Sequence, residues 1–260
     1  MKTIYYYQSF VALDKLLTHP KDIDVLIVSS IHFDKTRDNK PGIFLNDNDP
    51  NDVIFNAMWS QTKELYNKGV SIHLMIGGAG GAFDMLFSDF STYYPLLKRV
   101  LKDKSFISGI DLDVEEKTHY DDICMLIKKL KEDFPHFQIT MAPIAESLQR
   151  DGGSMGGFSY KKLYESDVGH SIDWFNVQCY GSFTKDTFES IVQNGYPPDK
   201  IVMGMISGEF TPDNFNEAIE TLKSIKNGYP TIAGVYDWEY YNAPPDEKDP
   251  SQWCKLLQQI

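Results

Sequence analysis

The sequence predicts an α/β fold, a single (β/α)8 or TIM barrel that spans residues 1–260 as one domain. Two observations predict it. Short apolar segments with strand character alternate with segments of helical periodicity along the whole chain, in eight strand–helix units. The length of 260 residues is close to the usual length of this barrel, which is about 250 residues. The same order of elements also suits an open doubly wound sheet, which is the alternative.

The predicted strands are rich in β-branched and aromatic residues and are bounded by polar or glycine-containing segments. The segment 24–30 is almost continuously apolar, as expected of a parallel strand that is covered on both faces. The strands are expected at 4–7, 24–30, 70–78, 106–116, 138–143, 173–180, 201–206 and 231–238.

Each predicted helix follows one of these strands and repeats apolar residues at a spacing of three to four. The helices are expected at 10–17, 52–67, 87–101, 120–134, 160–167, 187–194, 215–225 and 253–260. The polar segment 34–51 contains Pro41-Gly42 and a small apolar island, which indicates a hairpin or flap rather than a linker. Residues 151–157 are expected to form a glycine-rich loop.

Composition narrows the classes of partner. The net charge is -12 and no block of lysine and arginine occurs, which disfavours nucleic acid and anionic membrane surfaces as partners. The absence of a run of about 18 apolar residues excludes a membrane span. The first residues show no secretory signal, so the protein is expected inside the cell or as a mature secreted form. We expect a monomer.

The three cysteines, Cys124, Cys179 and Cys254, cannot all pair within the chain, and their spacing matches no metal site. They are interpreted as small buried hydrophobic residues. His73 is interpreted as a core residue because no partner histidine or cysteine shares its strand. The glycines near residue 78 lack the order and the following lysine of a phosphate-binding loop.

The segment 106–116 carries the strongest chemical signal. Asp111, Asp113 and Glu115 alternate with apolar residues, so a strand places all three acids on one face, about 6.6 Å apart between neighbouring Cα atoms. At that separation their protonation states couple. Two other interpretations stay open: a solvated face of an antiparallel sheet, and a site for a divalent cation. No metal-loop pattern with its turn glycine lies nearby, so neither a metal nor a cofactor is expected.

In a barrel, the apolar residues of this strand would face the helices and the three acids would face the interior. Burying carboxylates without partners costs several kcal/mol, which argues that the acids have a function. Glu115 is nearest to the carboxyl end of the strand, where the active sites of such barrels lie.

These residues resemble family 18 of the glycoside hydrolases, the chitinases and related endo-β-N-acetylglucosaminidases. The fourth strand of that family carries Asp-x-x-Asp-x-Asp-x-Glu, and Ser108 to Glu115 match it at every position except the first acid. The resemblance extends along the whole chain, through Ile76-Gly77-Gly78, Met141-Ala142-Pro143, Gln178-x-Tyr180 and Trp238.

The resemblance implies a role for each matched residue. Glu115 would be the general acid that protonates the leaving oxygen, and the nucleophile would be the 2-acetamido oxygen of the substrate, with overall retention. Asp113 would orient the acetamido N–H and stabilise the oxazolinium ion, with Asp111 as buried support. Tyr180 would hydrogen-bond the acetamido oxygen, and Trp238 would form the floor beneath the sugar. Tyr180 and Trp238 could instead be core aromatics.

Contact with the substrate is expected from Trp238, Gln178, Met141, Gly78 and Tyr7, with Phe83 and Phe183 as further candidates for the lining. The function implied is hydrolysis of chitin, chitooligosaccharides or other β-1,4-linked N-acetylglucosamine glycans. The alternatives are an endo-β-N-acetylglucosaminidase acting on N-glycans and a non-catalytic lectin or inhibitor on the same barrel.

Ser108 is the departure from the motif. In the family the first acid lies deep in the barrel and hydrogen-bonds its neighbours, so a hydroxyl at this position would remove one charge. This puts in question how protons distribute over Asp111 and Asp113, and therefore the pH optimum.

Overall fold

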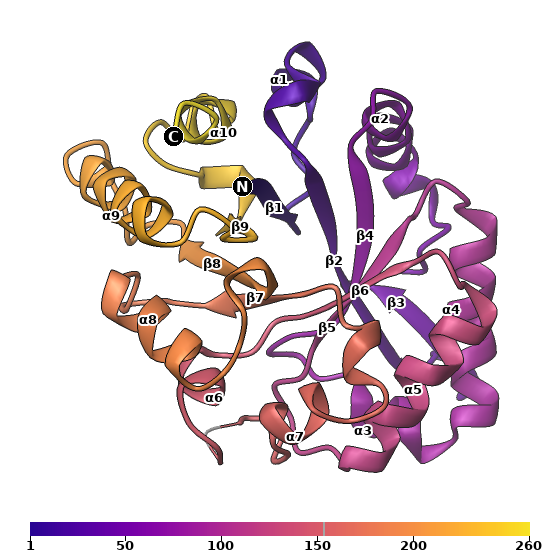
Figure 1. Cartoon of the computed structure of the whole chain (residues 1–260). Helices are drawn as coiled ribbons and strands as arrows, with labels where there is room; N and C mark the ends of the chain where they lie inside the picture. The colour runs from indigo at the N-terminus through magenta and orange to yellow at the C-terminus, as the bar shows by residue number, and fades with distance from the viewer. Residues whose placement is uncertain (153) are drawn as a thin grey trace.

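The computed structural model describes residues 1–152 and 154–260 and contains a closed barrel of eight parallel strands within those residues (Figure 1). The closing contact is the parallel pairing of β1 with both β2 and β9, which excludes the open sheet. The predicted (β/α)8 barrel is confirmed. Its strands are β1 (Lys2–Tyr7), β2 (Val25–Lys35), β4 (Ser71–Gly77), β5 (Gly109–Asp113), β6 (Gln138–Met141), β7 (Trp174–Gln178), β8 (Ile201–Ile206) and β9 (Gly234–Trp238).

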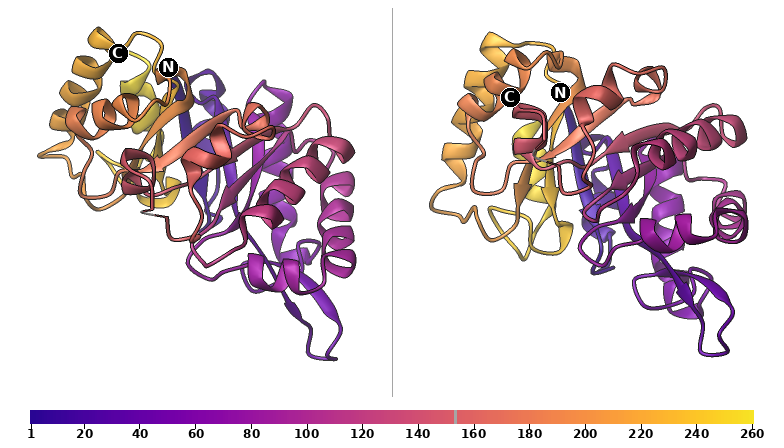
Figure 2. Two further views of the ribbon diagram at one scale, coloured as in Figure 1. Left: turned by 60° about the horizontal axis from the view of Figure 1, so that its bottom comes forward. Right: turned by 90° about the horizontal axis from the view of Figure 1, so that it is seen from below.

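A hairpin extends the barrel at one side. β2 continues beyond its predicted end and pairs antiparallel with β3 (Pro41–Leu45), so the predicted hairpin within 34–51 is confirmed. Figure 2 shows this hairpin, in violet, projecting away from the rest of the molecule. The turn uses Asn39 at φ 59°, in the left-handed region that asparagine tolerates better than most residues. The hairpin therefore adds a wall beside the mouth of the barrel.

Ten α-helices surround the barrel in the described part of the chain (Figure 1). They are α1 (Asp14–Thr18), α2 (Asn56–Asn67), α3 (Phe83–Ser88), α4 (Phe90–Asp103), α5 (Tyr120–Asp133), α6 (Ala145–Gln149), α7 (Tyr160–Tyr164), α8 (Lys185–Gln193), α9 (Phe215–Gly228) and α10 (Ser251–Leu257). Single helical turns of the 3-10 type are η1 (Pro20–Asp22), η2 (Val53–Phe55), η3 (Gly169–Ser171), η4 (Pro198–Lys200) and η5 (Tyr240–Asn242).

Several helix boundaries differ from the expectation, and at two of them an aspartate caps the start of a helix. The predicted helix 87–101 is divided at Asp89, whose side chain accepts a hydrogen bond from Thr92 N and begins α4. The predicted helix 52–67 begins with η2, where Asp52 accepts from Ile54 N, and continues as α2. The expected loop 151–157 is loop at its described positions, and Gly153 lies outside the described residues.

The core has two layers, as the alternation in β5 predicts. Ile110, Leu112 and Val114 are buried in the larger cluster between the strands and the helices. A smaller cluster, which includes Tyr6 and Tyr236, fills the barrel interior. Each large apolar side chain buried in this way contributes roughly 1.5–3 kcal/mol. The acids of β5 therefore face the interior, as expected.

The end of the barrel opposite the predicted site is closed by His73 and Trp174, whose rings stack with centroids 5.6 Å apart. A side chain at position 109 would put its Cβ 2.5 Å from the His73 ring, so Gly109 makes room for it. Burial lowers the pKa of His73 to about 4, which keeps the ring neutral at neutral pH. His73 is therefore a core residue, as predicted.

Cys179 and Cys254 are buried, Cys124 is half-buried, and all three are free thiols. Among the helices of residues 1–152 and 154–260, none has the length and apolar character needed to cross a bilayer.

Candidate active site

Asp111 is the deepest of the three acids and lies inside the barrel with no exposed surface. Its carboxylate accepts hydrogen bonds from Tyr6 OH at 2.7 Å, Thr140 Oγ1 at 2.6 Å and Asn176 Nδ2 at 3.0 Å. Burial raises the pKa of Asp111, and the three donors oppose that rise. This acid is held in place from three other strands of the barrel, β1, β6 and β7, which suits a supporting role.

Asp113 and Glu115 are joined by the amide group of Gln178. The Nε2 atom of Gln178 lies 3.2 Å from Asp113 Oδ1, 3.1 Å from Glu115 Oε1 and 2.9 Å from the carbonyl oxygen of Ala142. Burial, and then the charges of Glu115 and Asp111, raise the pKa of Asp113 well above its usual range. Asp113 is 5% exposed, whereas Glu115 is half-buried at the mouth. The pair can therefore hold a shared proton at the surface that a substrate reaches.

The glycines after β4 allow the chain to approach Asp113 closely. Gly77 and Gly78 have φ of 97° and 86°, and Gly78 N donates to the carbonyl oxygen of Asp113 at 2.9 Å. A Cβ at Gly77 would lie 2.2 Å from that same oxygen, and a Cβ at Gly78 would lie 3.6 Å from Asp113 Oδ2. Only glycine fits this path beside the acid.

Aromatic side chains form the wall around the acids. Tyr236 OH donates to Tyr180 OH at 3.1 Å, and the Tyr6 ring packs against Trp238 with centroids 5.2 Å apart. Burial, and then the charges of Asp113, Asp237 and Cys179, raise the pKa of Tyr180, although the hydrogen bond from Tyr236 opposes the rise. Tyr180 and Trp238 are half-buried, so each presents part of its surface at the mouth.

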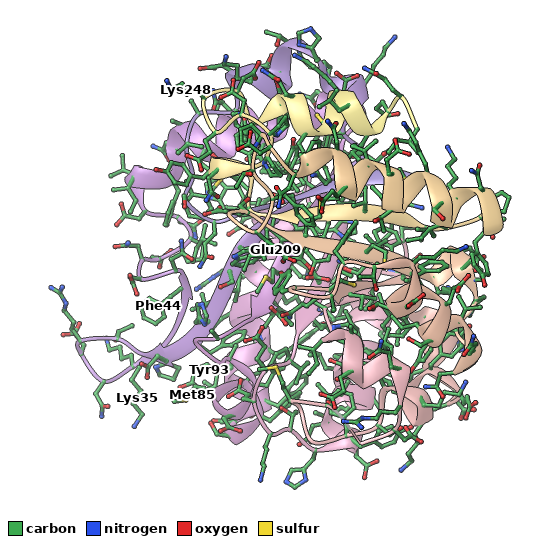
Figure 3. All side chains as sticks on the ribbon, turned by 90° about the vertical axis from the view of Figure 1, so that its left-hand side faces the viewer. Lys35, Phe44, Met85, Tyr93, Glu209 and Lys248 are labelled. Carbon is green, nitrogen blue, oxygen red and sulfur yellow. The ribbon has the colours of Figure 1, made fainter. Side chains whose placement is uncertain are left out.

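Two hollows flank these residues. The wide groove, of about 1270 Å³, runs from Trp238 and Gly78 past Gln8 to the β2–β3 hairpin. Figure 3 shows Lys35, Phe44 and Met85, which line it, at the same edge of the molecule. The small groove, of about 560 Å³, is lined by the segment 144–150 with Gln178, Tyr180 and Ser182. Asp113 and Glu115 lie between the two, because Gly78 belongs to one groove and Gln178 to the other.

The chain matches the family model of the glycosyl hydrolases family 18 over residues 2–255. It belongs to that family. A fungal endo-β-N-acetylglucosaminidase of family 18 is 30% identical, with a TM-score of 0.87, covering 99% of this chain and 96% of the other. The chitinase ChiC from Aspergillus fumigatus is 28% identical, with a TM-score of 0.85, covering 99% and 98%. A family 18 chitinase from Pseudoalteromonas aurantia is 19% identical, with a TM-score of 0.73, covering 100% and 99%. No curated protein matches the chain.

Within this family 18 barrel, the structure brings together Asp111, Asp113, Glu115, Gln178 and Tyr180 by the contacts described above. Trp238 and Gly78 lie beside them at the edge of the wide groove. Among the described residues, no group of three or more histidine, cysteine, aspartate or glutamate side chains is arranged to hold a metal ion.

Four of the predicted lining residues do not lie in the site. Met141 and Tyr7 are fully buried on the helix side of their strands, because Thr140 and Tyr6 take the inward positions. Tyr7 OH instead donates to the carbonyl oxygen of Val11 at 2.6 Å. Phe83 and Phe183 are also buried in the outer core. The structure thus places Met141, Tyr7 and the two candidates Phe83 and Phe183 in the outer core.

Ser108 lies outside the line of acids. Its Oγ both accepts from Ile72 N and donates to the carbonyl oxygen of Ile72, each at 3.2 Å, and it is bonded to neither Asp111 nor Asp113. Ser108 lies just before β5 and three residues before Asp111. Because side chains alternate between the two faces of a strand, Ser108 points away from the barrel interior. No hydrogen bond therefore connects Ser108 with Asp111 or Asp113, through which it could change their protonation as expected.

Sequence reasoning missed two glutamates that hold the loops of the wide groove. Glu116 Oε1 accepts from Ala82 N and Phe83 N, both at 2.5 Å. Glu239 Oε2 accepts from Gln8 N at 2.7 Å and from Ser9 N at 2.9 Å. Their partners are backbone groups far along the chain, which leave no spacing signal in the sequence.

Proposed function

We propose that this chain hydrolyses β-1,4-linked N-acetylglucosamine glycans, chitin or chitooligosaccharides, by retaining, substrate-assisted catalysis. The observation that carries the proposal is the amide of Gln178, whose Nε2 lies within hydrogen-bond distance of both Asp113 and Glu115 between two grooves. An amide nitrogen can only donate, so it stabilises the negative charge that the pair carries and leaves their shared proton available to the substrate.

Glu115 is the general acid in this proposal. It is the acid nearest to the mouth, and it shares one proton with Asp113, whose pKa burial raises. When Glu115 gives that proton to the substrate, Asp113 is left ionised. Proton transfer from Glu115 to the glycosidic oxygen accompanies attack of the acetamido oxygen on the anomeric carbon. Asp113 then faces the positive charge of the oxazolinium ion. Water opens that ion while Glu115 takes a proton back, so the configuration is retained.

Tyr180 is suited to hold the acetamido oxygen. Its hydroxyl accepts the hydrogen of Tyr236, so its own hydrogen is directed elsewhere and can be donated to the substrate. Trp238, packed on Tyr6, offers an apolar face beneath the sugar.

An endo-β-N-acetylglucosaminidase acting on N-glycans is the second candidate. It is favoured by the 30% identity with the fungal enzyme of that activity. The difference in size between the grooves also suits it, since a branched glycan needs more room on one side of the scissile bond. Incubation with chitooligosaccharides beside an N-glycoprotein distinguishes the two candidates by the substrate that is cleaved. A β-anomer in the first product supports retention.

The decisive variant is Glu115→Gln, which should reduce turnover of a chitooligosaccharide or N-glycan by on the order of 10²-fold or more. Glu132→Gln, on the exposed face of α5, is the matched control. Wild-type turnover in Glu115→Gln would exclude Glu115 as the acid.

A chitinase-like agglutinin from Robinia pseudoacacia shares the fold at 14% identity and a TM-score of 0.62. Calorimetric binding without any product would instead point to a lectin.

A further inference from the structure

Ser207, the residue after β8, holds the backbone on both sides of the bond between Trp238 and Glu239. Its N–H donates to the carbonyl oxygen of Trp238 at 2.6 Å, and its Oγ lies 3.0 Å from the carbonyl oxygen of Glu239. The Glu239 side chain in turn binds Gln8 N and Ser9 N. The segment Trp238–Glu239 therefore connects the floor of the site with the edge of the wide groove.

The Ser207 hydroxyl has more acceptors than hydrogens. Its Oγ lies 2.6 Å from Asp237 Oδ2 as well as 3.0 Å from Glu239 O, yet it carries a single hydrogen. If Asp237 were ionised, the hydroxyl could satisfy only one of these oxygens. A protonated Asp237 donates to Ser207 Oγ and leaves the serine hydrogen for Glu239 O. Both short contacts are then hydrogen bonds.

The surroundings of Asp237 favour the protonated form independently. The residue has no exposed surface, and its Oδ1 has no hydrogen-bond partner among the described residues. The groups that sense its charge are Glu239 on the same segment, Tyr5 on β1 and Tyr180 after β7. None of these is cationic. Burial, and then Glu239, keep the pKa of Asp237 well above its usual range.

We propose that Asp237 is a neutral positioning residue which, through Ser207, fixes Trp238 as the floor of the site and Glu239 as the anchor of the loop at Gln8. Only the role given to Trp238 rests on the proposed function. Neither Asp237 nor Ser207 contacts the substrate, because Asp237 faces away from the barrel interior.

We call the contacts of Ser207 with Asp237, Trp238 and Glu239 the clamp, and the clamp should weaken as the pH rises. When Asp237 releases its proton to solvent at alkaline pH, the Ser207 hydrogen turns to the new carboxylate, which is the stronger acceptor. The carbonyl oxygen of Glu239 then loses its donor. Trp238 becomes more mobile, and the wall at Gln8 loosens with it.

Acrylamide quenching of tryptophan fluorescence tests this without any substrate. Trp238 is only half-buried, whereas Trp59, Trp174 and Trp253 are 9%, 2% and 0% exposed, so quenching reports mainly on Trp238. The variants are Ser207→Ala and Asp237→Asn, whose amide can still donate to Ser207. Ser190→Ala on α8, which removes a hydroxyl bonded to Thr187 O, is the control.

The wild-type quenching constant should rise as the pH is raised and Asp237 loses its proton, while far-UV circular dichroism stays constant. Asp237→Asn should show no rise. Ser207→Ala should already show a higher quenching constant than wild type at pH 7, because Trp238 is the most exposed of the four indoles. It should also raise KM for long oligosaccharides more than it lowers kcat. Identical pH profiles for wild type and Asp237→Asn would overturn the proposal.

Two results separate this proposal from the proposed function. If Asp237→Asn does not fold, Ser207→Ala decides alone: a neutral-pH constant equal to that of wild type and of Ser190→Ala rejects the clamp. If the quenching results hold while Glu115→Gln keeps full turnover, the clamp stands and the hydrolase assignment fails.

Discussion

The Nε2 atom of Gln178 lies 3.2 Å from Asp113 Oδ1 and 3.1 Å from Glu115 Oε1, so one amide group on β7 holds both acids of β5. Gln178→Leu keeps the approximate size of the side chain but removes the donor. The negative charge of Asp113 and Glu115 is then no longer stabilised by the Gln178 amide. We expect kcat to fall by on the order of 10- to 10²-fold, with a smaller change in KM. Gln61→Leu, on α2 outside the barrel, should leave kcat unchanged.

The pH dependence of stability provides a second test at Asp113. In the unfolded chain its carboxyl ionises near pH 3.8, whereas in the fold burial keeps it protonated to higher pH. Above pH 3.8 the unfolded state therefore binds fewer protons, and the free energy of unfolding falls with rising pH by at most about 1.4 kcal/mol per unit. Asp113→Asn removes this contribution.

The Tm of Asp113→Asn minus that of wild type should therefore increase from about pH 4 to pH 8 in differential scanning calorimetry. Turnover should fall at every pH, because an amide cannot carry the charge that faces the oxazolinium ion. A Tm difference that is constant with pH would show that Asp113 is ionised in the fold.

Alternation determined how much of the site could be predicted. In β5 polar residues occupy every second position, so Asp111 and Asp113 were assigned to the correct face, whereas Gln178 on β7 was named only through the family resemblance. The segment 4–7 is apolar or aromatic on both faces, so its sequence gave no reason to prefer Tyr6 over Tyr7. At β6 the inward residue is Thr140, and the family resemblance drew attention to Met141 instead. Glu239 could not be found, because it binds backbone groups 231 and 230 residues away.

Ser108→Asp restores the first acid of the family motif. The new carboxylate can still accept from Ile72 N, but it cannot donate to the carbonyl oxygen of Ile72 as the Ser108 hydroxyl does, and these two acceptors repel each other. We expect a loss of stability of about 1–3 kcal/mol, measured by urea denaturation, with no shift in the pH optimum. A displaced optimum would mean that position 108 does communicate with Asp111.

Tyr180→Phe and Tyr236→Phe form a matched pair, since each removes one hydroxyl of the same hydrogen bond. Tyr180→Phe deletes the donor to the acetamido oxygen and should reduce kcat by about 10- to 10²-fold. Tyr236→Phe deletes only the group that orients Tyr180 and should have a several-fold smaller effect. If steady-state kinetics show equal losses of kcat in the two variants, Tyr180 alone would not be the donor to the acetamido oxygen.

The wide groove makes a prediction about substrate length. Phe44 on β3 is half-buried, lines this groove and belongs to the hairpin that projects from the barrel, so it should contact only sugars remote from the scissile bond. Phe44→Ala removes about half of a phenyl contact, worth about 1 kcal/mol, which corresponds to a roughly fivefold rise in KM for a pentasaccharide. A disaccharide reporter does not reach the hairpin and should show unchanged kinetics. Tyr66→Ala, an exposed aromatic on α2, is the control for losing a surface ring. Because Phe44 lies on the projecting hairpin, its loss should leave Tm nearly unaltered. Equal KM increases for the pentasaccharide and the disaccharide would contradict the prediction, because Phe44 would then affect sugars close to the scissile bond.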